Sequence, residues 1–255
     1  MGTGKPEDAE KSVAAVVRAL SLLDAFRADD TELTLAELSK RTQLYKSTIL
    51  RLIATLERFG YLERTAGGTY RIGAAPLRLA SLHKQALHPA EVILAALRAA
   101  VEQTGESASY FVRQGDTRIL LYRADSPRLL RDHLQPGDIV PLDRGAGSAI
   151  FRAFGSPQRA AEAGIRDRMV AIARGELEIG MAGMAAPVFD ATGRVAGVVT
   201  FSGPEFRFDP AAMDRMEPIL LRTVRSISSR LGAETGRFDA RLEVLGSAEL
   251  YPPVR

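Results

Sequence analysis

The stretch TLAELSKRTQLYKSTILRLIATLERFGYLERTAGGTYRI, residues 34–72, decides the fold of the first part of the chain. It begins with Thr34-Leu-Ala-Glu37, a capping box in which the threonine oxygen accepts the N–H of Glu37 and the glutamate side chain reaches back, so we expect a short helix here. A turn at Arg41-Thr-Gln-Leu44 precedes a second helix that opens at Ser47, or at Lys46 just before it. The predicted inward face of this helix, with apolar residues three and four positions apart, consists of Ile49, Leu52, Ile53, Leu56 and Phe59.

Two short strands are expected after the second helix. Gly60 stands where a helix end favours a left-handed residue, and residues 61–65 and 69–72 alternate around Ala66-Gly67-Gly68, which predicts a hairpin. Helix, turn, basic helix and hairpin in this order predict a winged helix-turn-helix, which places its second helix in the major groove of DNA. A preceding helix, with Ser12 as its cap, is predicted to bury an apolar stripe consisting of Val13, Val16, Val17, Leu20, Leu23 and Phe26.

Positive charge is concentrated in this region. Residues 1–88 contain 13 Lys and Arg and 10 Asp and Glu, a net charge of +3, whereas residues 89–255 contain 21 of each kind. Residues 40–84 alone contain nine basic and two acidic residues, a net charge of +7. A cluster of this sign is typical of a surface that binds a polyanion. A solvated helix face is the alternative.

The outward face of the second helix supplies the candidate DNA contacts. Free amides and a hydroxyl at its start favour phosphate, and Arg51, one turn on, can reach a guanine edge. The alternatives are that Ser47 only caps the helix and that Arg51 contacts only phosphate, since more than half of such hydrogen bonds go to the DNA backbone. The candidate DNA-binding residues are Thr34, Lys46, Ser47, Thr48, Arg51, Thr55, Arg58, Arg64 and Arg71.

Residues 74–88 predict a linker helix with a broad apolar surface. That surface consists of Leu77, Leu79, Ala80, Leu82 and Leu87. A single helix would leave much of it in water, so we expect packing against a partner subunit or a neighbouring helix, with packing inside the chain as the alternative. Pro89 then marks a domain boundary.

The C-terminal part predicts an antiparallel α+β domain. Hairpins are expected around Gly115-Asp116 and around residues 190–193, and helical patterns lie between them and after them. The expected helices cover residues 90–103, 147–154 and 165–174, begin at Ser156-Pro157, and run from Asp209-Pro210 to Leu231. Residues 233–255 show no periodicity and are expected to be a tail.

This domain has the features of a ligand pocket rather than of a reaction centre. Thr200 and Ser202 alternate along one predicted strand, so both hydroxyls face the same side, where a buried hydroxyl needs a partner. Arg144 can pair with a carboxylate, and the glycine-rich loop Arg144-Gly-Ala-Gly-Ser148 either cradles an anion or only makes a tight turn. The candidate effector-binding residues are Leu142, Arg144, Gly145, Ala146, Met181, Gly183, Met184, Thr200 and Ser202. Plain core packing is the alternative for the two methionines.

Several classes of function are disfavoured by the composition. The chain contains no cysteine and three histidines without a shared metal-ligand spacing, and no nucleophile elbow, phosphate-binding loop or zinc motif is present. We therefore predict no catalytic residue, no metal and no cofactor. No apolar run approaches the ~18 residues of a membrane span, and the polar first ten residues predict a disordered arm rather than a secretory signal. A cytoplasmic location is expected.

The sequence resembles the IclR family of bacterial transcriptional regulators over about residues 12–232. The motifs that carry the resemblance are Lys46-Ser47-Thr48, Arg51-Leu52, Thr55-Leu56, Gly60-Tyr61, Ala185-Ala-Pro-Val-Phe-Asp190 and Ser202-Gly-Pro204. The resemblance implies a winged helix-turn-helix joined by a helical linker to a GAF-like effector domain, in dimers or tetramers of dimers. Two positions depart from the family pattern: Gln43 stands where glycine is frequent, and Ser148 stands where lysine is frequent.

The sequence therefore predicts a ligand-responsive transcription factor, a repressor or activator of a small-molecule catabolic operon, and not an enzyme. Expected partners are double-stranded operator DNA, a small organic effector such as a carboxylate, and a second copy of the chain in a homodimer or dimer of dimers. The expected domains are residues 1–10 (arm), 11–73 (DNA-binding), 74–88 (linker), 89–232 (GAF-like) and 233–255 (tail). A small-molecule enzyme or a protein-binding adaptor with a basic helical module remains an alternative.

Overall fold

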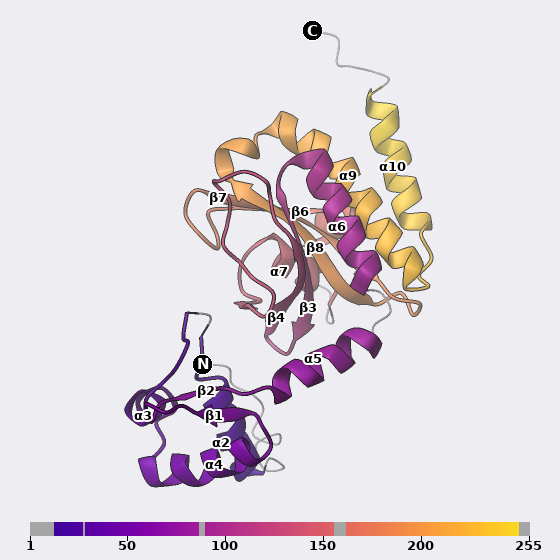
Figure 1. Ribbon diagram of the computed structural model, residues 1–255. Helices are drawn as coiled ribbons and strands as arrows, with labels where there is room; N and C mark the ends of the chain where they lie inside the picture. The colour runs from indigo at the N-terminus through magenta and orange to yellow at the C-terminus, as the bar shows by residue number, and fades with distance from the viewer. Residues whose placement is uncertain (1–12, 28, 87–89, 156–161, 250–255) are drawn as a thin grey trace. The chain divides into compact units, whose positions relative to one another are not determined.

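The structure is a computed structural model that describes residues 13–27, 29–86, 90–155 and 162–249. The chain divides into two compact units, residues 1–87 and 88–255 (Figure 1). The arm expected at residues 1–10 and the helix expected to begin at Ser156-Pro157 lie outside the described residues. Among the described helices, none combines the length and hydropathy needed to cross a membrane.

Helices and a small hairpin build the first unit. Its elements are α2 (Ala14–Leu23), α3 (Leu35–Thr42), α4 (Lys46–Arg58), β1 (Leu62–Arg64), β2 (Tyr70–Ile72) and α5 (Ala75–Ala86). Strands β1 and β2 pair antiparallel, and Leu33 adds a single bridge to Tyr70. The core between the helices and the hairpin consists of Leu22, Ala25, Leu33, Leu38, Ile49, Ile53, Leu56, Leu62 and Tyr70.

The local signals at the start of α3 and in the turn after it behave as the sequence predicts. Thr34 is the N-cap of α3, and both hydrogen bonds of the capping box to Glu37 are present. Gln43 ends the helix in the left-handed conformation at φ 58°, a position that usually favours glycine. Its side-chain amide donates to the carbonyl oxygen of Lys40 at 2.6 Å, which gives the non-glycine residue a local partner.

The prediction for the apolar stripe of α2 was wrong in part. Val13 is 65% exposed, and Val16, Val17 and Leu20 are also exposed, whereas the core receives Leu22. The helix carries apolar residues on two faces, so spacing alone could not tell which face packs inward. On α4, Phe59 is also exposed rather than inward, because it is the residue at which the helix ends.

The second unit is a six-stranded antiparallel sheet covered on both faces. The strand order is β5-β4-β3-β8-β7-β6. Its strands are β3 (Ser107–Gln114), β4 (Thr117–Ala124), β5 (Ile139–Pro141), β6 (Ala171–Arg174), β7 (Met181–Phe189) and β8 (Val195–Pro204). Its helices are α6 (Ala90–Thr104), α7 (Ala146–Ala153), α8 (Ala163–Arg168), α9 (Pro210–Arg230) and α10 (Gly236–Glu249), with a 3-10 turn η2 (Glu205–Arg207).

The helices divide the core of this unit into two layers. Helices α6 and α9 cover one face of the sheet, and α10 packs against α9, whereas α7 contacts β6, β7 and β8 from the other face (Figure 1). A bulge between β3 and β4 pairs Tyr110 with Tyr122 but Phe111 with Leu120. The bulge therefore sends Tyr122 toward the α6 and α9 layer and Leu120 toward the α7 layer.

Two element predictions in this unit were wrong. The helix expected over residues 165–174 ends at Arg168, because Met169 takes a left-handed conformation and the chain continues as the edge strand β6. The tail expected over residues 233–255 contains α10, whose Phe238 is fully buried against Phe189. The helix has little amphipathic contrast because Phe238, the partly buried Leu242 and Leu245 and a few ion pairs, rather than a long apolar stripe, attach it.

Candidate nucleic-acid interface and ligand cavity

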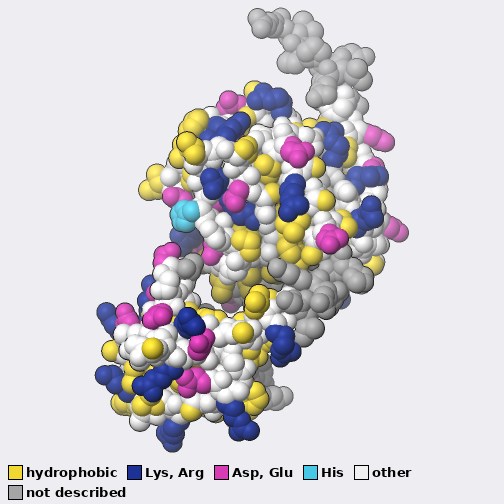
Figure 2. Space-filling view, in the orientation of Figure 1, with side chains coloured by type: hydrophobic (Ala, Val, Ile, Leu, Met, Phe, Trp, Pro, Cys, Tyr) yellow, Lys and Arg dark blue, Asp and Glu magenta, His cyan; other side chains and the backbone are white. Residues whose placement is uncertain are grey.

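The outward face of α4 is exposed and basic. Lys46, Ser47, Arg51, Thr55 and Arg58 are all exposed, and Thr48 is half-buried. Figure 2 shows Lys and Arg side chains along the lower edge of the first unit, where Figure 1 places α4. Tyr45 is the N-cap of α4 and makes no side-chain cap bond. Ser47 therefore stands inside the first turn, and the alternative that it only caps the helix is wrong.

Of the other predicted DNA-binding residues, Thr34 and Arg71 bind neighbouring side chains of the chain itself. The backbone N–H of Thr34 donates to the Glu37 carboxylate at 2.8 Å, and the Thr34 hydroxyl donates to it at 2.7 Å. These two hydrogen bonds lower the pKa of the Glu37 carboxyl. On the hairpin, Arg71 pairs with Glu63 at 2.9 Å, and both side chains are about half exposed. A surface pair of this kind contributes little and can exchange its partner for phosphate. Arg64 is exposed on β1.

One ion pair fixes the scaffold beneath α4. The guanidinium of Arg41 in α3 binds Asp30 and also donates to the carbonyl oxygen of Ala25 at 2.8 Å, so it ties α3 to the loop after α2. The bonds from Arg41 lower the pKa of Asp30 to about 2, so the carboxylate stays charged throughout the neutral range.

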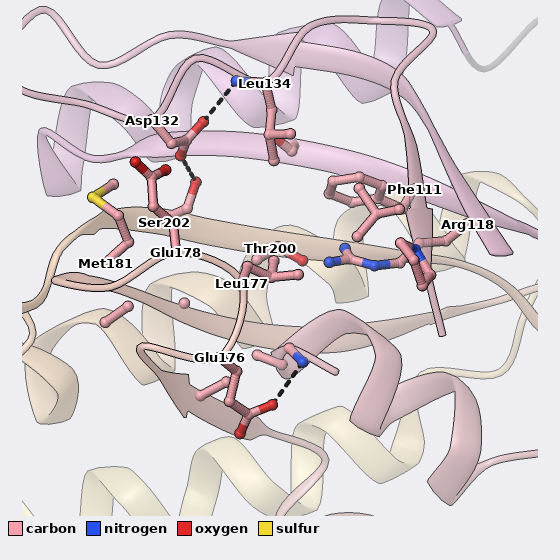
Figure 3. A pocket seen from close by; sticks show the side chains of 18 of the residues that line it. Phe111, Arg118, Asp132, Leu134, Glu176, Leu177, Glu178, Met181, Thr200 and Ser202 are labelled. Atoms are coloured by element: carbon pink, nitrogen blue, oxygen red, sulfur yellow. Dashed lines mark hydrogen bonds between the residues drawn. The ribbon is translucent and has the colours of Figure 1, made fainter. Parts of the chain in front are cut away.

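The second unit contains a cavity of about 280 Å³ on the α7 side of the sheet. It lies between the sheet, the start of α7 and the loops that precede β5 and β7 (Figure 3). The structure brings six of the predicted pocket residues to its wall, namely Gly145, Ala146, Met181, Gly183, Thr200 and Ser202. These six residues come from β7, β8 and the start of α7, and Thr200 and Ser202 lie on the same side of β8, as their spacing predicted.

Three predicted pocket residues lie elsewhere. Met184 is fully buried in the α6 and α9 layer, because adjacent residues of a strand face opposite sides and Met184 follows Gly183 on β7. Leu142 packs in the α7 layer and lines a separate surface hollow. Arg144 is exposed and pairs with its neighbour Asp143 at 3.1 Å.

The cavity wall contains a cation that the sequence analysis missed. Arg118 on β4 is 1% exposed, and its guanidinium lies 4.1 Å from the centre of the Phe111 ring. Burial alone lowers its pKa to about 10, so it remains protonated at neutral pH. The signal was present: Arg118 stands two residues before Leu120, in the inward register of the strand. An arginine at such a position is normally interpreted as an exposed edge residue.

The opposite wall holds an ordered acid. Asp132 pairs with the buried Arg123 at 2.7 Å and accepts a hydrogen bond from the Ser202 hydroxyl (Figure 3). The carboxylate is therefore neutralised by Arg123, and the Ser202 oxygen keeps lone pairs that can accept a hydrogen bond.

In the loop before α7, a side chain of the chain itself already binds a backbone amide. The N–H of Gly145 donates to the Glu176 carboxylate at 2.7 Å, so this amide is already bonded. Ser148, at the position where the family often has lysine, donates to the carbonyl oxygen of Pro141 at 3.1 Å. Within the described residues, no group of three His, Cys, Asp or Glu side chains is placed to hold a metal ion.

Comparison with known proteins gives the same assignment for both units. Residues 15–66 match the IclR helix-turn-helix domain, and residues 160–229 match the bacterial transcriptional regulator IclR C-terminal domain. The DNA-binding transcriptional repressor YiaJ of Escherichia coli is 27% identical over 247 residues, which cover 86% of this chain and 88% of YiaJ. The probable transcriptional regulator SauR of Cupriavidus necator is 34% identical over 144 residues, 56% of this chain and 57% of SauR.

Solved structures share the fold. The IclR transcriptional regulator from Alicyclobacillus acidocaldarius superposes with a TM-score of 0.74 at 21% identity, over 86% of this chain and 98% of that one. An IclR homologue from Microbacterium hydrocarbonoxydans, solved with 4-hydroxybenzoate, gives a TM-score of 0.70 at 19% identity, over 86% of this chain and 99% of that one. The chain belongs to the IclR family of DNA-binding transcriptional regulators.

Proposed function

We propose that two copies of this chain bind operator DNA in the cytoplasm through their α4 helices, and that a small organic effector in the cavity controls this binding. The exposed basic face of α4 is the observation that carries the proposal. Lys46 and Ser47 at the helix start would contact phosphate, Arg51 would contact a base edge or phosphate, and the hairpin arginines Arg64 and Arg71 would follow the backbone.

The dimer accounts for the apolar face of α2. The exposed residues Val13, Val16, Val17 and Leu20 recur at helical spacing on one side of α2, which offers a second copy of α2 a self-complementary surface. Two recognition helices related by a twofold axis would then meet half-sites about one helical turn apart. An operator with this symmetry follows from the proposal.

The effector would act by differential binding. A ligand that binds one arrangement of the dimer more tightly than another shifts the population toward it, and DNA affinity changes by that difference. The 4-hydroxybenzoate bound by the Microbacterium homologue supports a small carboxylate as the ligand class. The output would be the control of a small-molecule catabolic operon.

The test is DNA binding by Arg51→Ala. Fluorescence anisotropy would use a duplex that the wild-type protein enriches from a random-sequence pool, at one fixed salt concentration. We expect Arg51→Ala to weaken binding by about 1–3 kcal/mol if Arg51 reads a base. The matched control is Arg98→Ala, an exposed arginine on α6, which should bind as the wild type does. Unchanged affinity in Arg51→Ala would argue that α4 is not the reading helix.

A further inference from the structure

The cavity contains a buried positive charge that has no counter-ion among the residues that the structure describes. Arg118 is almost completely buried, and its Nε and Nη1 atoms have no hydrogen-bond partner among the described residues. A buried charge is normally paired and a buried donor is normally bonded, because leaving either unsatisfied is costly. The face of Phe111 offers a weak substitute for a partner. An unpaired guanidinium on the wall of a cavity is therefore suited to bind an anion.

Arg118 and Thr200 pack closely against the backbone of Gly147. A Cβ atom added at Gly147 would lie 2.7 Å from Arg118 Nη1 and 3.1 Å from Thr200 Oγ1. The buried Thr200 hydroxyl also has no partner among the described residues, and Figure 3 shows the guanidinium pointing toward it. Two unsatisfied donors therefore lie beside one another, and only glycine at position 147 leaves room for both. A carboxylate can accept from both, and its planar pair of oxygens matches the guanidinium fork.

Three other anion-binding groups near the cavity are already used. Glu176 holds the Gly145 amide at the start of α7. Arg144 pairs with Asp143, and Arg123 pairs with Asp132. Of the arginines Arg118, Arg123 and Arg144 of the described chain, the one without an ion pair is Arg118 on β4, and not the loop residue Arg144 that the sequence analysis favoured.

The far side of the cavity accepts a different group. Ser202 stands two residues beyond Thr200 on β8, about 7 Å along the strand. Its hydroxyl donates a hydrogen bond to Asp132. Its oxygen is left as an acceptor, and Asp132 is already neutralised by Arg123. This end suits a neutral donor such as a hydroxyl. The walls between the two ends are mostly apolar, with Phe111, Leu134, Val140 and Met181 among them.

We propose that Arg118 and Thr200 bind the carboxylate of a monocarboxylic effector whose apolar body, the size of one ring, ends in a hydroxyl at Ser202. This inference rests on the proposed function, since it names the ligand class of the same regulator. It assigns a specificity-determining role to Arg118, because a neutral ligand of the same shape would leave the guanidinium unpaired.

The test compares carboxylates with neutral ligands of the same shape. Benzoate and 4-hydroxybenzoate, with benzamide and 4-hydroxybenzamide as their neutral counterparts, would be added to the full-length protein in thermal unfolding and calorimetry. We expect the wild type to be stabilised more by each acid than by its amide. Arg118→Met should abolish the preference and weaken binding of the acids about tenfold or more.

The ligand-free variant provides an independent readout. A role for Arg118 in holding the fold predicts that Arg118→Met melts below the wild type. A binding role predicts that it melts at the same temperature or higher, because an unpaired buried charge has been replaced by an apolar side chain of similar length. Arg118→Lys keeps the charge but not the fork, so it should retain a reduced preference for the acids. Arg144→Met is the matched control and should behave as the wild type.

Three outcomes would overturn the inference: no acid in the panel binds, the amides bind as tightly as the acids, or Arg118→Met keeps the preference. DNA affinity, measured on the same samples, separates this failure from that of the proposed function. Acids that bind through Arg118 but leave DNA affinity unchanged would remove the effector role while the ligand assignment stands. A normal DNA response to the amides would remove the ligand assignment alone.

Discussion

At the scale of single residues, Gln43 shows how one side chain sustains a turn that glycine would make without strain. Its left-handed conformation places a Cβ where a residue other than glycine is strained. The bond from its amide to the Lys40 carbonyl offsets part of that strain and satisfies one of the carbonyl groups that the end of α3 leaves open. The spacing between α3 and α4 depends on this turn, so the residue controls the geometry that presents α4.

Substitutions at Gln43 should separate the strain from the bond. Gln43→Ala keeps the strained conformation and loses the bond, whereas Gln43→Gly loses both. We expect Gln43→Gly to exceed Gln43→Ala in unfolding free energy by about 1 kcal/mol, measured by urea denaturation. Thr42 and Leu44 stay unchanged in both variants, so the difference reports the conformation of one residue. Equal stability of the two variants would show that position 43 carries no strain.

The residue scale is also where the sequence was least informative about the cavity. The alternation of Thr200 and Ser202 located one wall correctly, because period two is a local property of a strand. Arg118 was missed because an arginine is normally interpreted as an exposed residue even in the inward register of a strand, and its burial depends on tertiary contacts such as that with Phe111. Met184 was included because a methionine side chain adapts to the shape of a ligand. The alternative of plain core packing is correct for it, because adjacent residues of a strand face opposite sides.

At the scale of elements, strong local signals predicted the structure and tertiary contacts explain the exceptions. The capping box, the Gln43 turn and the hairpin around Gly67 and Gly68 are encoded within a few residues, so the elements from α3 to β2 were predictable. The buried face of α2 was not, because it depends on which neighbours the helix contacts. Strand β6 was predicted as helix because its residues, Ala171–Arg174, form a strand only by pairing with β7. Helix α10 was missed because its attachment is a matter of contacts with α9 and Phe189.

The attachment of α10 rests mainly on Phe238, with help from the partly buried Leu242 and Leu245 and from ion pairs. Phe238 is fully buried beside Phe189, and Arg241 reaches the buried carboxylate of Glu217 in α9 at 2.8 Å. Arg168 of α8 binds the same carboxylate, and the two arginines together outweigh burial and lower the pKa of Glu217. Helices α8, α9 and α10 are thus joined at one acid.

Removal of Phe238 should therefore destabilise the second unit. We expect Phe238→Ala to reduce its free energy of unfolding by about 3–5 kcal/mol, the usual cost of truncating a buried aromatic residue. Urea denaturation followed by circular dichroism would measure it. Val244→Ala, an exposed position on the same helix, is the matched control and should change stability by less than about 0.5 kcal/mol. A variant as stable as the wild type would mean that α10 adds nothing to the core.

At the scale of the whole molecule, the two units divide the work of a regulator. The charge that suits DNA is concentrated in the first unit, whereas the second carries as many acids as bases and contains the cavity. Such a division makes regulation a matter of coupling free energy. An effector can change DNA affinity only by the factor by which DNA changes effector affinity.

Ser202→Ala tests this coupling from the effector side. The variant removes the acceptor for the ligand hydroxyl but leaves the Arg118 and Thr200 end intact, so binding of 4-hydroxybenzoate should weaken by about 1 kcal/mol, or roughly fivefold. Affinity for DNA without ligand should stay at the wild-type value, because Ser202 lies in the second unit. The 4-hydroxybenzoate concentration that produces half of the DNA response should rise by the same fivefold factor.

Calorimetry with and without saturating duplex measures the factor by which DNA changes the affinity for the ligand. This factor must equal the one by which the ligand changes the affinity for DNA. Benzoate, which lacks the hydroxyl, is the matched probe and should bind Ser202→Ala and the wild type equally. If Ser202→Ala loses DNA affinity in the absence of ligand, Ser202 supports the fold rather than the response. If the half-response concentration stays unchanged, the hydroxyl end of the ligand does not lie at Ser202, and the orientation proposed for it in the cavity is wrong.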